Sequence, residues 1–106
     1  MKVRFKSDDL EYYYLTPFSE MKGKLPIPNE IILQFKKKIQ ILISIESINE
    51  LNSFRSLHFE PLKGKRQGEY SIRLNLQYRL IFKIEQDNQL VIDLIVIQEI
   101  SKHYEI

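Results

Sequence analysis

PLKGKRQGEYSIRLNLQYRLIFK, residues 61–83, contains two runs in which every second side chain is hydrophobic. The hydrophobic positions are Tyr70, Ile72 and Leu74 in the first run and Tyr78, Leu80, Phe82 and Ile84 in the second, which continues past the quoted stretch. A period of two is typical of a β-strand that buries one face and exposes the other. The stretch therefore predicts a β-hairpin with one apolar face and one charged face.

The short loop Asn75-Leu76-Gln77 limits how the two strands can pair. Keeping both apolar sets on one side pairs Ile72 with Leu80 and sets Arg73 opposite Arg79 on the other side. Like charges in this position are destabilising, and a carboxylate or a bound phosphate between the guanidinium groups would relieve the repulsion. The pair therefore indicates an anion site, and the alternative is two solvated arginines splayed apart. Loss of Arg79 should leave stability unchanged or slightly higher.

The length of 106 residues predicts one domain, residues 1–106, with one core between a sheet and a helix layer. The chain has no cysteine, which excludes disulfides, thiolate metal sites and thiol nucleophiles. No apolar run reaches the roughly 18 residues of a membrane span, and residues 1–9 lack the apolar stretch of a signal peptide. We expect a cytoplasmic protein without membrane association.

Positive charge is concentrated in the middle of the chain, although the formal net charge is only +2. Residues 55–83 carry seven Lys and Arg against two acidic residues. Residues 84–106 carry five acidic residues against Lys102. The basic segment indicates a polyanionic partner. Candidates to bind it are Lys65 and Arg66, in the predicted loop of residues 64–68, and Lys83.

The N-terminal half predicts a short strand at residues 2–5 followed by two helices. Ser7 begins the first helix, which Thr16 and Pro17 end. After a loop at residues 15–28, Asn29 is expected to cap a long helix. Apolar side chains recur along it at spacings of three and four, at Ile32, Phe35, Ile39, Leu42 and Ile45.

Three consecutive lysines, Lys36, Lys37 and Lys38, lie on this helix, mostly away from its apolar face. They could contact nucleic acid, or they could form a solvated helix face, as such runs more often do. Both interpretations stay open, and Lys36 and Lys37 are kept as candidate RNA-binding residues.

Two further strands complete the predicted sheet. Residues 57–60 should begin it, with Leu57 and Phe59 facing the core and His58, a weak site candidate, on the other face. Residues 90–97 alternate poorly and predict a central strand, buried on both sides except at Asp93. Residues 98–106 should then fold back along the exposed face of the sheet.

Three motifs, in this order, resemble the HigB toxins of the RelE/ParE superfamily. They are Leu-Lys-Gly at residues 62–64, Gly-x-Tyr-Ser-Ile-Arg at residues 68–73 and aromatic-Arg-x-x-Phe at residues 78–82. The resemblance covers nearly the whole chain. It implies an α+β fold, in which a small twisted, mainly antiparallel, RelE-like β-sheet packs against two N-terminal α-helices and carries a shallow basic site on its exposed face.

The resemblance also implies a function. HigB relatives are toxins of type II toxin–antitoxin systems that enter the ribosomal A site and cut the messenger RNA there. A HigA-like helix-turn-helix antitoxin neutralises them, and operator DNA is contacted only through that antitoxin. The expectation for this chain is a ribosome-dependent endoribonuclease, or mRNA interferase.

Cleavage of this kind requires no metal and no cofactor, because the attacking 2′-hydroxyl belongs to the RNA. The site needs a group to take its proton, cations to stabilise the pentacovalent phosphate, and a group to protonate the leaving oxygen. The sequence has no HExxH pattern and no Asp/His cluster at ligand spacing, which argues against a metallonuclease.

Carried over residue by residue, the resemblance implies roles for Arg79 and Lys63, with Arg73 and Arg66 as supporting cations. Together with the basic residues named above and the polar tail, this gives two sets of candidate site residues. The catalytic set is Lys63, Arg73, Arg79, His103 and Tyr104, and the RNA- or ribosome-binding set is Lys65, Arg66, Lys83, Lys36, Lys37 and Glu60. Two departures leave the general acid and base open. Glu60 stands where many relatives have His, and the segment up to Tyr104 differs from the Asp-Tyr-His that ends many of them.

Two other functions remain as alternatives. The same fold carries ParE-like inhibitors of DNA gyrase, and a fold does not by itself decide a function. DNA damage on expression would favour that reading. An inactive module that only binds the antitoxin is the second alternative, and the absence of any growth effect would favour it.

Overall fold

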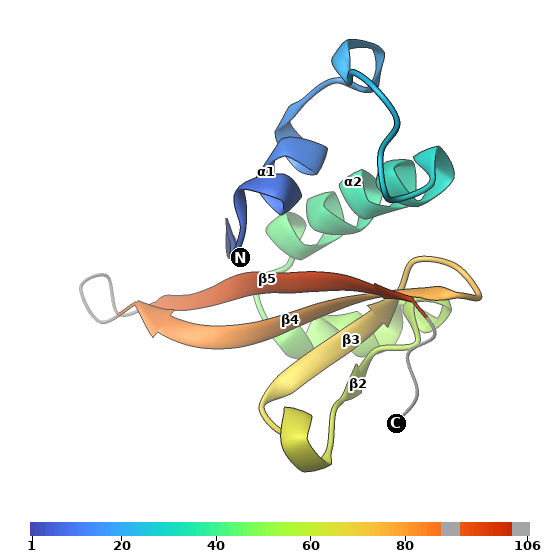
Figure 1. Ribbon diagram of the computed structural model, residues 1–106. Helices are drawn as coiled ribbons and strands as arrows, with labels where there is room; N and C mark the ends of the chain where they lie inside the picture. The colour runs from blue at the N-terminus through green and yellow to red at the C-terminus, as the bar shows by residue number, and fades with distance from the viewer. Residues whose placement is uncertain (88–91, 103–106) are drawn as a thin grey trace.

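The computed structural model of the chain describes residues 1–87 and 92–102 (Figure 1). Two α-helices lie on one side of a five-stranded sheet, so the expected α+β class is confirmed. In chain order the elements are β1 Lys2–Phe5, α1 Asp8–Leu15, η1 Phe18–Glu20, α2 Asn29–Ser44, η2 Ile48–Ser53, η3 Arg55–Leu57, β2 Glu60–Pro61, η4 Gly64–Arg66, β3 Glu69–Arg73, β4 Tyr78–Asp87 and β5 Ile92–Lys102. Within these described ranges, no helix has the length and apolarity to cross a membrane.

The sheet has the strand order β1-β5-β4-β3-β2. Strand β5 runs parallel to β1 on one side and antiparallel to β4 on the other. Its residues 94–97 are all buried and Asp93 is exposed, which confirms the predicted central strand over the part that is described. Residues 90 and 91 of that prediction lie outside the described residues. Because β5 continues to Lys102, the prediction that residues 98–102 fold back along the sheet is wrong. Residues 103–106 lie outside the described residues.

The β3–β4 hairpin has the register that the alternation predicts. In its loop, Asn75 Oδ1 accepts hydrogen bonds from the backbone N–H groups of Gln77 and Tyr78, both at 2.8 Å. An Asn side chain that binds the backbone ahead of it in this way stabilises a tight turn. The loop and the apolar face therefore favour the same pairing. The pairs include Ile72 with Leu80 and Arg73 with Arg79.

The predicted strand at residues 57–60 is largely replaced by a turn. Residues 55–57 form a 3-10 helix, and His58 follows in the left-handed conformation with φ 46°. Only Glu60 and Pro61 pair as strand β2, at the edge of the sheet. A left-handed residue interrupts an extended run, and Pro61 has no N–H to donate to a neighbouring strand. These two features explain why the strand is short.

The core lies between the sheet and the two helices. Helix α2 buries the stripe that the spacing predicts, at Ile32, Phe35, Ile39 and Leu42, and Ile45 follows at its end. On the sheet side, the rings of Phe59, Tyr70 and Phe82 stack with centroids 5.6 Å, 5.8 Å and 6.4 Å apart. Leu57 is buried too, so the predicted inward direction of this side chain and of Phe59 is confirmed.

The helix starts match the sequence at α1 and differ slightly at α2. Ser7 Oγ accepts a hydrogen bond from the backbone N–H of Leu10 at 3.3 Å, which confirms the predicted cap of α1. Asn29 is the first helical residue of α2, and the cap position belongs to Pro28. The predicted cap is therefore wrong by one residue, since Pro28 already has the extended conformation of a cap.

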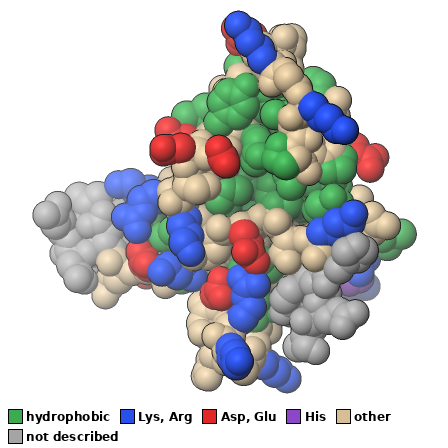
Figure 2. Space-filling model, viewed as in Figure 1, with side chains coloured by type: hydrophobic (Ala, Val, Ile, Leu, Met, Phe, Trp, Pro, Cys, Tyr) green, Lys and Arg blue, Asp and Glu red, His purple; other side chains and the backbone are tan. Residues whose placement is uncertain are grey.

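The outer face of the sheet, which points away from the helices, is partly buried as well. A bulge in β5 shapes this face, because Ile81 pairs with Glu99 and Phe82 with Ile97, which leaves Gln98 as an extra residue. The long stems of Arg and Lys side chains can cover apolar groups beneath them, and charged side chains of both signs are interspersed over the sheet (Figure 2). Among the described residues, the buried hydrophobic side chains outside the main core are Leu62, Ile81, Leu94 and Val96.

The aromatic stack predicts a large loss of stability when its fully buried ring is removed. Phe82 is fully buried, so we expect Phe82→Ala to lower the free energy of unfolding by about 3–5 kcal/mol, measured by urea denaturation. Phe54, which is 39% exposed, provides the matched control, and Phe54→Ala should cost about 1 kcal/mol or less. Equal losses in the two variants would show that the stack is not the centre of the core.

Candidate functional site

Arg79 is held on the outer face of the sheet by groups from β2, β3 and the turn before them. Its Nε and Nη2 donate to Ser71 Oγ at 3.1 Å and 2.6 Å. Nη2 also donates to the carbonyl oxygen of His58 at 2.7 Å and lies 3.4 Å from Glu60 Oε1. The side chain is only 13% exposed. The guanidinium group is therefore fixed in direction before any ligand binds.

Local structure explains how these partners reach Arg79. The left-handed turn at His58 brings its carbonyl oxygen to the arginine. Glu60 pairs with Ser71 across β2 and β3, and Ser71 lies two residues before Arg73, the cross-strand partner of Arg79. Alternate residues of a strand share a face. The carboxylate, the hydroxyl and the guanidinium groups therefore lie on the same side of the sheet.

Ser71 is the site residue that sequence reasoning missed. It is fully buried, and its hydroxyl accepts two hydrogen bonds from Arg79. A buried polar side chain normally has a partner, because leaving it unpaired costs free energy. The one signal in the sequence was its position on the same strand face as Arg73.

Arg73 and Arg79 form the expected cross-strand pair, and the repulsion between them is relieved from one side. Arg79 leans toward Ser71 and Glu60, so the carboxylate contacts Arg79 and does not lie between the two guanidinium groups as expected. Arg73 is half-buried, and its side chain makes no hydrogen bond or ion pair with any residue in the ranges 1–87 and 92–102.

Arg66 and Lys83, two candidate RNA-binding cations, already pair with carboxylates. Arg66 Nε lies 3.0 Å from Glu69 Oε1, and its Nη1 lies 2.8 Å from Glu99 Oε1. The hydrogen bond to Glu69, followed by the one to Glu99, raises the pKa of Arg66. Lys83 Nζ lies 2.7 Å from Glu85 Oε1. A phosphate would therefore exchange with an existing partner at either cation.

Lys63 and Lys65 are exposed near the tip of the β2–β3 hairpin, away from Arg79. The backbone N–H of Leu62 bonds to the carbonyl oxygen of Glu69 at 2.8 Å, so Lys63 lies beyond the level of Glu69 in the ladder. Arg79 pairs with Arg73, which lies four residues after Glu69 along β3, a distance of about 13 Å. The structure therefore places Lys63 near the first residue of β3 and Arg79 beside its last residue.

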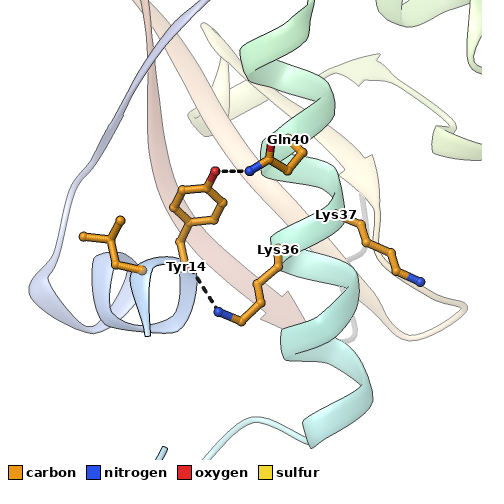
Figure 3. A pocket seen from close by; sticks show the side chains of 5 residues that line it. Tyr14, Lys36, Lys37 and Gln40 are labelled. Atoms are coloured by element: carbon orange, nitrogen blue, oxygen red, sulfur yellow. Dashed lines mark hydrogen bonds between the residues drawn. The ribbon is translucent and has the colours of Figure 1, made fainter. Parts of the chain in front are cut away.

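Lys36 and Lys37 lie on helix α2 (Figure 3), in the helix layer, whereas Arg79 lies on the outer face of the sheet. Lys36 Nζ donates to the carbonyl oxygens of Tyr14 at 3.0 Å and Thr16 at 2.5 Å, and so binds the C-terminal end of α1. Burial lowers the pKa of Lys36. Lys37 points away from it and lines a hollow of about 420 Å³. This hollow is separate from the arginine site.

His103 and Tyr104, the two candidates in the tail, lie outside the described residues. Their predicted place near the arginines stays a prediction.

A protein family and two relatives match this sequence. A family model for the RelE-like toxin of the type II toxin–antitoxin system HigB matches residues 3–97, which include all three motifs. Toxin HigB-1 of Vibrio cholerae is 35% identical over 83 residues, which cover 78% of this chain and 83% of that toxin. An uncharacterized protein of Haemophilus influenzae is 35% identical over 94 residues, or 87% of this chain and 89% of the relative.

Two solved structures share the fold at lower identity. A YoeB/ParE toxin from Agrobacterium tumefaciens has a TM-score of 0.54 and 19% identity, over 98% of this chain and 100% of that one. A YoeB–YefM complex from Staphylococcus aureus has a TM-score of 0.54 and 19% identity, over 98% of both chains. At this identity the likeness shows the fold alone.

The hydrogen bonds of Arg79 predict that its removal destabilises the protein, contrary to the expectation from charge repulsion alone. We expect Arg79→Ala to lower the free energy of unfolding by about 1–3 kcal/mol, because Ser71 loses its partner in a buried position. The matched control is Arg73→Ala, on the facing strand, which should change stability by less than about 0.5 kcal/mol. Urea denaturation measures both, and a stable Arg79→Ala variant would contradict a structural role.

Proposed function

The chain belongs to the HigB family of RelE-like toxins of type II toxin–antitoxin systems, and from this premise we propose that it is a ribosome-dependent endoribonuclease that cuts messenger RNA. The observation that carries the proposal is the fixed guanidinium group of Arg79 beside the carboxylate of Glu60 on the outer face of the sheet. Arg79 is also the arginine of the aromatic-Arg-x-x-Phe motif. A cation and a possible proton acceptor thus share one site.

The proposed reaction is an internal transesterification of the RNA. The O2′ atom attacks the adjacent phosphorus, so that an O2′–P bond forms while the P–O5′ bond breaks. The proton of the 2′-hydroxyl passes to a base, and the leaving O5′ takes a proton from an acid. The products are a 2′,3′-cyclic phosphate and a 5′-hydroxyl, and the chemistry uses no group that the RNA and the protein do not supply.

Arg79 is suited to stabilise the charge that develops on the phosphate. Because Ser71 and the His58 carbonyl hold its Nε and Nη2, the group needs little reorganisation when the pentacovalent state forms. Arg73, across the strand pair, would add a second cation. The fork of a guanidinium group matches two phosphate oxygens at once.

Proton transfer is assigned to residues around this arginine. The proposed acceptor of the proton of the 2′-hydroxyl is the carboxylate of Glu60, which contacts Arg79. His103 and Tyr104 are the proposed donors to the leaving oxygen, on the basis of the family resemblance. Lys63, at the far end of the hairpin, is proposed to contact the RNA rather than the reacting phosphate.

Positioning of the RNA is proposed to come from the ribosome. The outer-face residues of β3 and β4 next to Arg79 offer charge but no aromatic ring on which a base could stack; they are Glu69, Ser71, Arg73, Ile81 and Lys83. Without stacking, a bare RNA strand has little to orient its 2′-hydroxyl for attack. In this proposal the ribosome holds the message, and the toxin adds the fixed charges.

A HigA-like helix-turn-helix antitoxin is the proposed protein partner, with operator DNA contacted only through it, and the cytoplasm is the proposed location. The family supports an antitoxin as partner. The solved YoeB–YefM complex supports the same for this fold.

The first functional prediction is that cleavage depends on the ribosome. Purified protein should cut a message held on translating ribosomes and leave the same transcript intact in their absence, because the ribosome supplies the orientation. The readout is the mapping of 5′ ends by primer extension. Rapid cleavage of the bare transcript would overturn the ribosome dependence. DNA breaks with intact messages would instead support inhibition of gyrase.

The second functional prediction concerns Arg79. Arg79→Ala should reduce cleavage on the ribosome by about 100- to 1,000-fold, the usual effect of removing one group that stabilises transition-state charge. Arg79→Lys keeps the positive charge but loses the forked guanidinium group, so it separates the effect of geometry from the effect of charge. Its cleavage rate should fall between those of the native protein and of Arg79→Ala. Lys24→Ala, in an exposed loop before α2, is the control and should cut like the native protein. Full activity in a folded Arg79→Ala variant would exclude this arginine from the reaction.

A further inference from the structure

A second group of basic side chains lies on the outer face, at the β1 edge of the sheet. The register brings them together, because Arg4 on β1 pairs with Val96 on β5, and Val96 pairs with Lys83 on β4. Lys6 follows directly after β1. A hollow of about 260 Å³ lies between them, lined by Arg4, Phe5, Lys6, Lys83, Glu85, Val96 and Gln98. We call it the β1–β4 hollow.

One carboxylate, that of Glu85, lies among these cations. Arg4 Nη2 is 2.8 Å from its Oε2 and Lys83 Nζ is 2.7 Å from its Oε1, so each oxygen binds a different cation. The hydrogen bond to Lys83, with a smaller effect of Arg4, lowers the pKa of Glu85. Lys6 makes no ion pair within residues 1–87 and 92–102. Three cations therefore face one carboxylate, and the hollow is positively charged.

The arrangement is open to solvent and is not needed to hold the sheet together. The side chains of Arg4, Lys83 and Glu85 are 59%, 40% and 37% exposed. Ion pairs with this exposure contribute little to stability. The arrangement instead provides positively charged hydrogen-bond donors that converge on one anion, the Glu85 carboxylate. A phosphate oxygen is the same kind of acceptor as the Glu85 carboxylate.

We propose that the β1–β4 hollow binds a phosphate of an RNA backbone, at a distance from the phosphate that is cut. Lys83 lies four residues from Arg79 along β4, or about 13 Å, so the two sites contact different phosphates. Glu85 holds Arg4 and Lys83 in place and competes with the phosphate for them. The choice of RNA as the ligand rests on the proposed function, whereas the charge of the hollow does not.

The test is the salt dependence of binding, measured with probes that cannot be cut. One probe is a single-stranded RNA with 2′-O-methyl groups throughout, which lacks the attacking hydroxyl, and the other is vacant ribosomes. Each phosphate contact on a single strand contributes about 0.7 to the slope of log affinity against log salt. Lys6→Gln should therefore lower that slope by about 0.7. Glu85→Gln should raise affinity about fivefold at low salt, because a competing charge is lost.

A matched control and the direction of the Glu85 effect separate this proposal from general charge attraction. Lys24→Gln removes one exposed positive charge elsewhere and should leave the slope unchanged. A smaller slope for Lys6→Gln with both probes identifies the message as a source of the phosphate, and a change with ribosomes alone identifies ribosomal RNA. An unchanged slope with both probes, or weaker binding by Glu85→Gln, would overturn the proposal. Because no probe is cleaved, the outcome is independent of whether the protein cuts RNA.

Discussion

The register of the β3–β4 hairpin is the constraint on which the core and the charged face both depend. Side chains alternate along a strand, so a slip of β4 by one residue against β3 would turn Leu80 outward and Arg79 into the core while Ile72 stayed inward. Burial of the apolar face opposes such a slip. Asn75 opposes it as well, because its side chain binds two backbone N–H groups of the loop. The strand pairing that packs the core therefore also sets the positions of Arg73 and Arg79 on the outer face.

Several cations of the outer face are paired with carboxylates. Arg79 has Glu60 beside it, and Arg66 bridges Glu69 and Glu99 across the strands between them. Exposed pairs of this kind add little stability, but they hold long side chains in one direction. A phosphate oxygen can take the place of a carboxylate oxygen at any of them. The sheet can therefore fold with its cations ordered and still accept an RNA backbone.

Alternation along the sequence was enough to predict the hairpin and its register, because burial of one strand face leaves a periodic trace. The central strand was predicted from the opposite pattern, since a strand buried on both faces alternates poorly. It failed at residues 57–60, since the left-handed conformation of His58 and the 3-10 helix before it leave no such trace. It also could not find Ser71 as a partner of the site arginine, because that contact joins neighbouring strands. The position of Glu99 on the outer face depends in addition on the bulge at Gln98. That bulge is seen only in the pairing of β4 with β5.

Strand β5 follows the other four described strands in the chain and is the one that joins β1 to the rest of the sheet. A ribosome makes the chain from its N-terminus, so β5 is synthesised after both of its neighbours. Before β5 is available, β1 has no neighbour in the sheet, and β4 lacks one of its two partners. Glu99 and Val96, which belong to the outer face, are absent as well. A nascent chain on its own ribosome therefore cannot present the finished charged surface until synthesis has passed β5.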